Sequence, residues 1–153
     1  MPVVKVWDRI IMVPLIGMLD SERTQMMMEI LLEALENLQA KVAILDISGI
    51  PVVDTLVARH LITAASAAKL MGAECIITGV RARIAQTLVQ LGIDLGGIVT
   101  CTAMADGLQL ALEMTDQKIR EMKNTDIPFF KMAFSVQKNI PISKTVYLQI
   151  SFP

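Results

Sequence analysis

Short apolar runs of strand length alternate with helix-length segments along most of this chain, and this alternation constrains the fold most. Residues 42–47 are apolar except for Asp46, which is typical of a central strand buried on both faces. Residues 75–78 form a second such run and 98–100 a shorter one, each followed by a segment with helical spacing. Strands that alternate with helices in this way predict an α/β fold with a largely parallel sheet.

The remaining segments complete the layer, which we expect to be a mixed, mostly parallel sheet of four to five strands with about four helices. Residues 3–7 and 10–14 are expected to form an initial strand pair with a tight connection. Helices are expected over residues 20–38, 54–71 and 81–91, and from Thr102 or Ala103 to about Lys123. We therefore predict one domain over residues 1–123 and a C-terminal extension over residues 124–153.

The predicted extension has a composition of its own. Five of the six aromatic residues lie in it: Phe129, Phe130, Phe134, Tyr147 and Phe152. Residues 144–152 alternate between apolar and polar side chains, as an edge strand or an intermolecular β-contact would. The alternative is a poorly ordered terminal segment.

Composition excludes several classes of function. Hydrophobic residues make up 54% of the chain, which is ample for a core, and a net charge of -1 without a basic stripe argues against nucleic acid as a partner. No apolar run approaches the roughly 20 residues that span a bilayer, and the N-terminus lacks signal-peptide features. We expect a cytoplasmic protein without a membrane partner. A mean hydropathy of +0.56 favours self-association through exposed apolar surface.

Few residues have a pattern that indicates catalysis. The single histidine, His60, lies within a predicted helix, and Cys75 and Cys101 have no metal-type spacing. Phosphate-binding motifs of the Walker and G-x-G-x-x-G types are missing from the sequence. We therefore expect no enzyme, no metal and no cofactor.

The segment 47–55 is the strongest candidate site. It follows the central strand and opens the next helix, so Thr55 is expected at a helix N-terminus at the carboxyl edge of the sheet. Free backbone N–H groups and the helix dipole favour negative charge there, so a phosphorylated threonine would be tolerated. Asp54 and Asp46 would oppose the added charge. The alternative is that Asp54 or Thr55 only caps the helix.

Thr87 is the second candidate phosphorylation site. It shares a helix stripe with Arg83 and Gln90, offset from the inward-facing residues, so a phosphate on Thr87 would reach Arg83 one turn earlier. Arg81 follows a strand at the same sheet edge as Thr55. The alternative is an ordinary surface threonine.

Three stretches together resemble a known family. They are residues 13–17 (Val-Pro-Leu-Ile-Gly), 46–55 (Asp-Ile-Ser-Gly-Ile-Pro-Val-Val-Asp-Thr) and 79–87 (Gly-Val-Arg-Ala-Arg-Ile-Ala-Gln-Thr). Residues 3–120 resemble a STAS (anti-sigma-factor antagonist) domain, specifically the carboxy-terminal domain of RsbR-type stressosome proteins. RsbR-type proteins usually carry an amino-terminal sensor domain, whereas this sequence starts at the first STAS strand.

The resemblance implies a non-catalytic switch protein in stress signalling. Such domains assemble with a sister STAS protein and hold a serine/threonine switch kinase, which phosphorylation releases to act on a downstream regulator. It also implies that Thr55 and Thr87 are the phosphoacceptors. A small-ligand or nucleotide-binding STAS module, with an anion site at the strand ends, is the alternative function.

Overall fold

The computed structural model describes residues 1–116, 120–121 and 146–147. The chain divides into two units, Met1–Asp116 and Gln117–Pro153. In the second unit, β6 (Arg120–Glu121) pairs antiparallel with β7 (Val146–Tyr147). The predictions for residues 124–153 otherwise lie outside the described residues.

The first unit is built on a five-stranded sheet. Its strands are β1 (Val4–Trp7), β2 (Ile10–Ile16), β3 (Val42–Gly49), β4 (Glu74–Thr78) and β5 (Val99–Thr100). They lie side by side in chain order; β1 is antiparallel to β2, and the other neighbouring pairs are parallel. The described helices are α1 (Ser21–Asn37), α2 (Thr55–Leu70), α3 (Ala82–Gln90) and α4 (Met104–Met114). The predicted mixed, mostly parallel sheet with four helices is confirmed.

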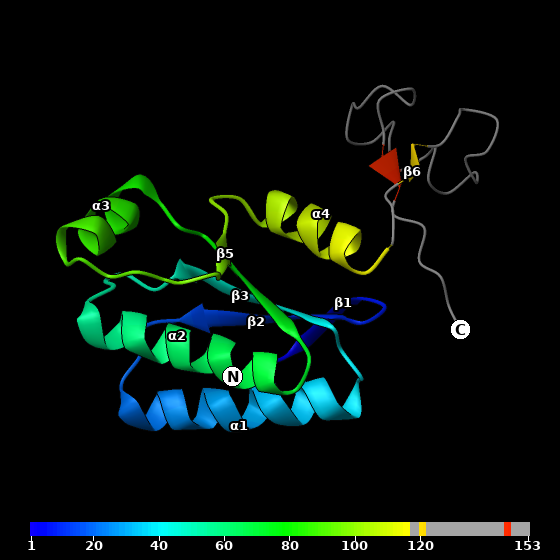
Figure 1. Cartoon of the computed structure of the whole chain (residues 1–153), viewed down its shortest axis with the longest axis horizontal. Helices are drawn as coiled ribbons and strands as arrows, with labels where there is room; N and C mark the ends of the chain where they lie inside the picture. The colour runs from blue at the N-terminus through cyan, green and yellow to red at the C-terminus, as the bar shows by residue number, and fades with distance from the viewer. Residues whose placement is uncertain (117–119, 122–145, 148–153) are drawn as a thin grey trace. The chain divides into compact units, whose positions relative to one another are not determined.

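Helices α1 and α2 lie side by side and cover one face of the sheet (Figure 1). Alternate residues of the central strands point to this face, as the period of two requires. They join apolar residues of both helices in one core cluster, which includes Ile11, Val13, Leu15, Ala43, Leu45, Ile47, Met27, Leu31, Leu61 and Ala64. Buried alanines on α2 let that helix approach the sheet closely.

Helix α4 contacts β3 and β4 (Figure 1). Its buried Gly107 lies against Thr78, because a Cβ atom built on Gly107 would be 2.3 Å from Thr78 Cγ2. Only a residue without a side chain allows the helix to pack this closely on the strand.

The prediction that the last helix reaches Lys123 is wrong, since α4 ends at Met114. Thr115 turns its hydroxyl back to the carbonyl of Ala111 at 2.8 Å, and the next residue, Asp116, has a φ of 57°. A left-handed residue directly after the last turn ends a helix. Arg9 donates to the Thr115 carbonyl at 2.7 Å and fixes this end against the β1–β2 turn.

Candidate functional site

Thr55 is the first residue of α2, and its side chain is exposed. Asp54 is the N-cap, because its carboxylate accepts a hydrogen bond from the Val57 amide at 2.8 Å. The sequence left the cap open between these two residues, and the structure assigns it to Asp54. Among the described residues the Thr55 hydroxyl has no hydrogen-bond partner. It is therefore accessible at a helix N-terminus and is not needed as a cap.

The segment before Thr55 is anchored at both ends. Ile50 and Val53 are buried, and the Ile50 amide donates to the Ile47 carbonyl at 3.0 Å. Arg81, the residue before α3, donates from Nη2 to the Ile50 carbonyl at 2.9 Å. Arg81 thus ties residues 50–53 to the start of α3.

Asp46 organises the ends of the two central strands. Its carboxylate accepts hydrogen bonds from the Ser48 hydroxyl at 2.8 Å and the Thr78 hydroxyl at 3.1 Å. Gly79, with a φ of 81°, packs so tightly here that a Cβ atom would be 2.5 Å from the Ser48 amide nitrogen. The Asp46 carboxylate therefore links the ends of β3 and β4.

Thr87 is one of the residues that line a hollow of about 310 Å³ between α3 and residues 51–53. We call it the arginine hollow; it is lined by Pro51, Val52, Val53, Arg81, Arg83, Ile84 and Thr87. Thr87 is half-buried, and its hydroxyl donates to the Arg83 carbonyl at 2.9 Å. None of the residues lining the hollow is acidic, so its two guanidinium groups give it a positive charge. Arg81 therefore joins Arg83 and Thr87, which the sequence analysis had already paired, at one place.

Exposed apolar side chains gather at the carboxyl end of the sheet, and the sequence analysis did not predict them. Ile16, Met18, Val52 and Leu56 are 66%, 69%, 62% and 50% exposed. Ile16 lies beside Gly49 at the end of β3, while Val52 and Leu56 flank Asp54 and Thr55 in sequence. We call these four residues the carboxyl-edge surface.

Arg23 anchors Ile16 and Met18, the two residues of this surface that precede α1. Its guanidinium donates to the Ile16 carbonyl at 2.7 Å and to the Met18 carbonyl at 2.6 Å. A cation in the first turn of a helix opposes the helix dipole, and the two hydrogen bonds of Arg23 offset that effect. That unusual position was the one sequence signal for this contact.

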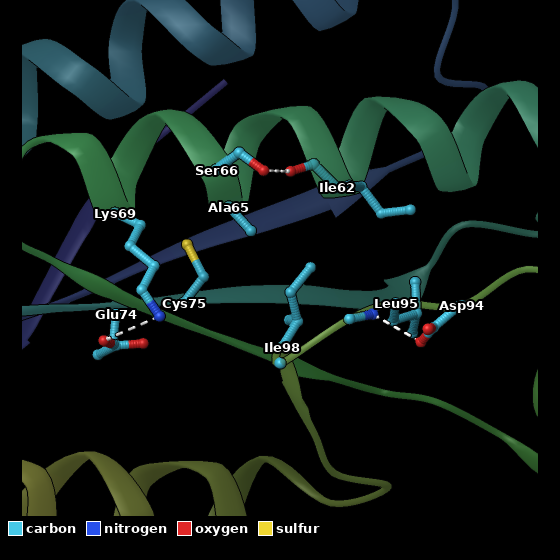
Figure 2. A pocket seen from close by; sticks show the side chains of 11 residues that line it. Ile62, Ala65, Ser66, Lys69, Glu74, Cys75, Asp94, Leu95 and Ile98 are labelled. Atoms are coloured by element: carbon cyan, nitrogen blue, oxygen red, sulfur yellow. Dashed lines mark hydrogen bonds and ion pairs between the residues drawn. The ribbon is translucent and has the colours of Figure 1, made fainter.

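A second hollow of about 220 Å³ lies between α2, the start of β4 and residues 94–98 (Figure 2). Its polar side chains are already engaged: Ser66 donates to the Ile62 carbonyl, Lys69 pairs with Glu74, and Asp94 accepts from the Gly96 amide. Figure 2 shows Cys75 directed toward α2. Burial, with a smaller effect of Glu74, raises the pKa of this thiol to about 12, so it stays protonated at neutral pH. These groups offer a polar ligand little to bind.

Within the described residues, no group of three or more histidine, cysteine or acidic side chains is placed to hold a metal ion. His60 is half-buried in α2, and its Nε2 atom has no hydrogen-bond partner there. The described helices include none with the length and apolar character needed to cross a bilayer.

Comparison with known proteins agrees with this architecture. A profile of the STAS domain matches residues 1–99. The chain is 47% identical over 118 residues to the RsbT co-antagonist protein RsbRA of Bacillus subtilis, an overlap of 77% of this chain and 43% of the relative. It is 39% identical over 107 residues to RsbRD of the same organism, covering 70% of this chain and 38% of that protein. The chain thus spans less than half the length of these relatives.

Solved structures give the same result. An RsbS variant from Moorella thermoacetica superposes with a TM-score of 0.64 at 31% identity, covering 76% of this chain and 97% of that one. A chain from a structure of the stressosome, described as a signal integration and transduction hub, superposes with a TM-score of 0.61 at 29% identity. The overlap covers 74% of this chain and 98% of that one. The profile match over most of the first unit and these superpositions show that the chain belongs to the STAS domain family.

Proposed function

We propose that this chain is a non-catalytic, phospho-regulated scaffold protein that binds a serine/threonine switch kinase and releases it when Thr55 is phosphorylated. The observation that carries the proposal is the exposed, unbonded Thr55 hydroxyl next to the exposed Val52 and Leu56. A kinase that docks on the carboxyl-edge surface buries these apolar side chains and has Thr55 within its interface.

The phosphorylation step supplies its own release mechanism. The Thr55 oxygen attacks the terminal phosphorus of a nucleoside triphosphate held by the kinase, the bond to the nucleoside diphosphate breaks, and the hydroxyl proton passes to the kinase's base. The product carries about -1.5 to -2 charges, which bind water strongly. Burying that charge against apolar partner groups costs free energy, so the kinase dissociates.

The relatives support the kind of partner. RsbRA and RsbRD are both named as co-antagonists of RsbT, which favours an RsbT-type kinase as the ligand of the carboxyl-edge surface. The likeness to RsbS and to a stressosome chain favours a sister STAS protein and self-association in a larger assembly. Thr87 is the second proposed acceptor, because it lines the arginine hollow, where the two guanidinium groups favour an added phosphate.

Phosphopeptide mapping after incubation with an RsbT-type kinase and ATP tests the assignment. We expect modification at Thr55 and Thr87, and none in a Thr55→Ala/Thr87→Ala double variant. Thr63→Ala is the matched control. Thr63 is exposed on α2, as Thr55 is, and its hydroxyl donates to the carbonyl four residues earlier, as that of Thr87 does. Label that persists in the double variant and disappears in the control variant would overturn the proposal.

A further inference from the structure

The arginine hollow has guanidinium N–H donors that are free to bind an anion. The Arg83 guanidinium makes no hydrogen bond or ion pair with any described residue, and the Arg81 guanidinium uses only Nη2, toward Ile50. An arginine has five N–H donors, so most of the donors at the hollow are unused. This contrasts with the hollow beside Cys75, where Ser66, Lys69, Glu74 and Asp94 already have partners.

Thr87 is placed to deliver a phosphate into this hollow. Helical side chains lean toward the N-terminus of their helix, and the Thr87 oxygen accordingly lies at 2.9 Å from the Arg83 carbonyl, one turn earlier. A phosphate on that oxygen extends toward the start of α3. No side chain caps the N-terminus of α3, so the positive end of its dipole adds to the charge of the two arginines.

We propose that the arginine hollow is a phosphate-binding site, with Arg81 and Arg83 as its ligands, for a phosphate ester on Thr87. The proposal rests on the proposed function in one respect, since it takes Thr87 as a phosphoacceptor. Arg81 keeps its bond to the Ile50 carbonyl while its other N–H groups bind the phosphate. The modified Thr87 therefore fixes Arg81, and Arg81 fixes the segment 50–53 that leads to Thr55. The hollow thus couples the two threonines physically.

The test uses the full chain with phosphothreonine installed at position 87 during synthesis, so that it needs no kinase. Hydrogen–deuterium exchange of the backbone amides in residues 52–55 should slow by about fivefold relative to the unmodified chain, equivalent to about 1 kcal/mol. In ³¹P NMR titrations, the two arginines should lower the pKa of the phosphate below that of phosphothreonine in an unfolded peptide. Arg81→Gln and Arg83→Gln should each reduce both effects.

Phosphothreonine at position 63 is the matched control. Thr63 bonds the carbonyl of Arg59 four residues earlier at 2.8 Å, as Thr87 bonds that of Arg83, but it lines neither hollow. Phosphothreonine at position 63 should leave amide exchange at residues 52–55 unchanged. Equal exchange in the chains with and without phosphothreonine 87, or equal effects from both phosphothreonines, would overturn the proposal. If millimolar inorganic phosphate or ATP slows amide exchange of the same segment in the unmodified chain, the hollow binds a free ligand. That result would overturn the role of Thr87. None of these results depends on whether a kinase binds at Thr55.

Discussion

Replacing Thr55 with glutamate separates an effect on the partner from an effect on the fold. The fold loses no described hydrogen bond in this variant, because the Thr55 hydroxyl makes none. The new carboxylate gains about 0.3–1 kcal/mol from the N-terminal end of α2. Repulsion from the adjacent Asp54 is of similar size, about 0.7 kcal/mol for two charges about 6 Å apart in a water-like dielectric. The two effects nearly cancel, so the free energy of unfolding should change by less than about 0.5 kcal/mol.

Asp54→Ala gives the contrast, because Asp54 has the structural role that Thr55 lacks. The substitution removes the 2.8 Å hydrogen bond from the Val57 amide. Loss of an N-cap costs about 1 kcal/mol, which lowers the melting temperature by about 4 °C in a domain of this size.

Thermal melts followed by circular dichroism, on the full chain at low ionic strength, measure both variants against the parent. We expect the melting temperature of Thr55→Glu to match that of the parent, and that of Asp54→Ala to fall. A fall for Thr55→Glu as large as that for Asp54→Ala would refute the reasoning, because it would show that the Thr55 side chain supports the fold.

Four further predictions concern individual residues. Gly107→Ala should lower the free energy of unfolding by about 1–3 kcal/mol in chemical denaturation, because its Cβ would meet Thr78, whereas Gly97→Ala, with open space around it, should not. Cys101, which is half-buried, should react with a thiol reagent at pH 8 before the buried Cys75, which should need denaturant; reaction of Cys75 first would contradict its burial. The unfolded Cys75 thiol loses its proton above about pH 9 and the folded thiol only near 12, so its contribution to stability should fall across that window in pH-dependent melts. Arg23→Gln should weaken kinase binding by about fivefold with little change in melting temperature, because it frees the Ile16 and Met18 carbonyls; unchanged affinity in calorimetry would remove Arg23 from the positioning of the surface.

Local sequence patterns predicted the elements well where one physical signal dominated. The apolar run around Leu45 identified the central strand, and Asp54 followed by an alanine-rich segment marked the start of α2. The end of α4 was missed because no glycine or proline follows Met114. The stop comes from Asp116 in a left-handed conformation and from the tertiary contact between Arg9 and Thr115, and neither is visible in local composition.

The candidate site was predicted as separate residues but not as an arrangement. Topology alone brought Thr55 and Arg81 to one sheet edge, yet the bond from Arg81 to the Ile50 carbonyl depends on side-chain geometry. The repulsion between Asp46 and a phosphate on Thr55 stays a prediction, while the hydrogen bonds that Asp46 accepts from Ser48 and Thr78 were not predicted. The exposure of Ile16 was likewise not predicted, because the apolar run of β2 does not distinguish Ile16 from the buried residues before it.

The affinity of an RsbT-type kinase for Thr55→Glu, measured by isothermal titration calorimetry, tests the central claim most directly. We expect binding at least about tenfold weaker than to the parent chain, equivalent to about 1.4 kcal/mol, because the new charge lies beside the apolar carboxyl-edge surface. Thr63→Glu, which adds the same charge farther along α2, should bind as the parent does. If the kinase binds Thr55→Glu as tightly as the parent, phosphorylation at Thr55 does not release it, and the proposed switch is wrong.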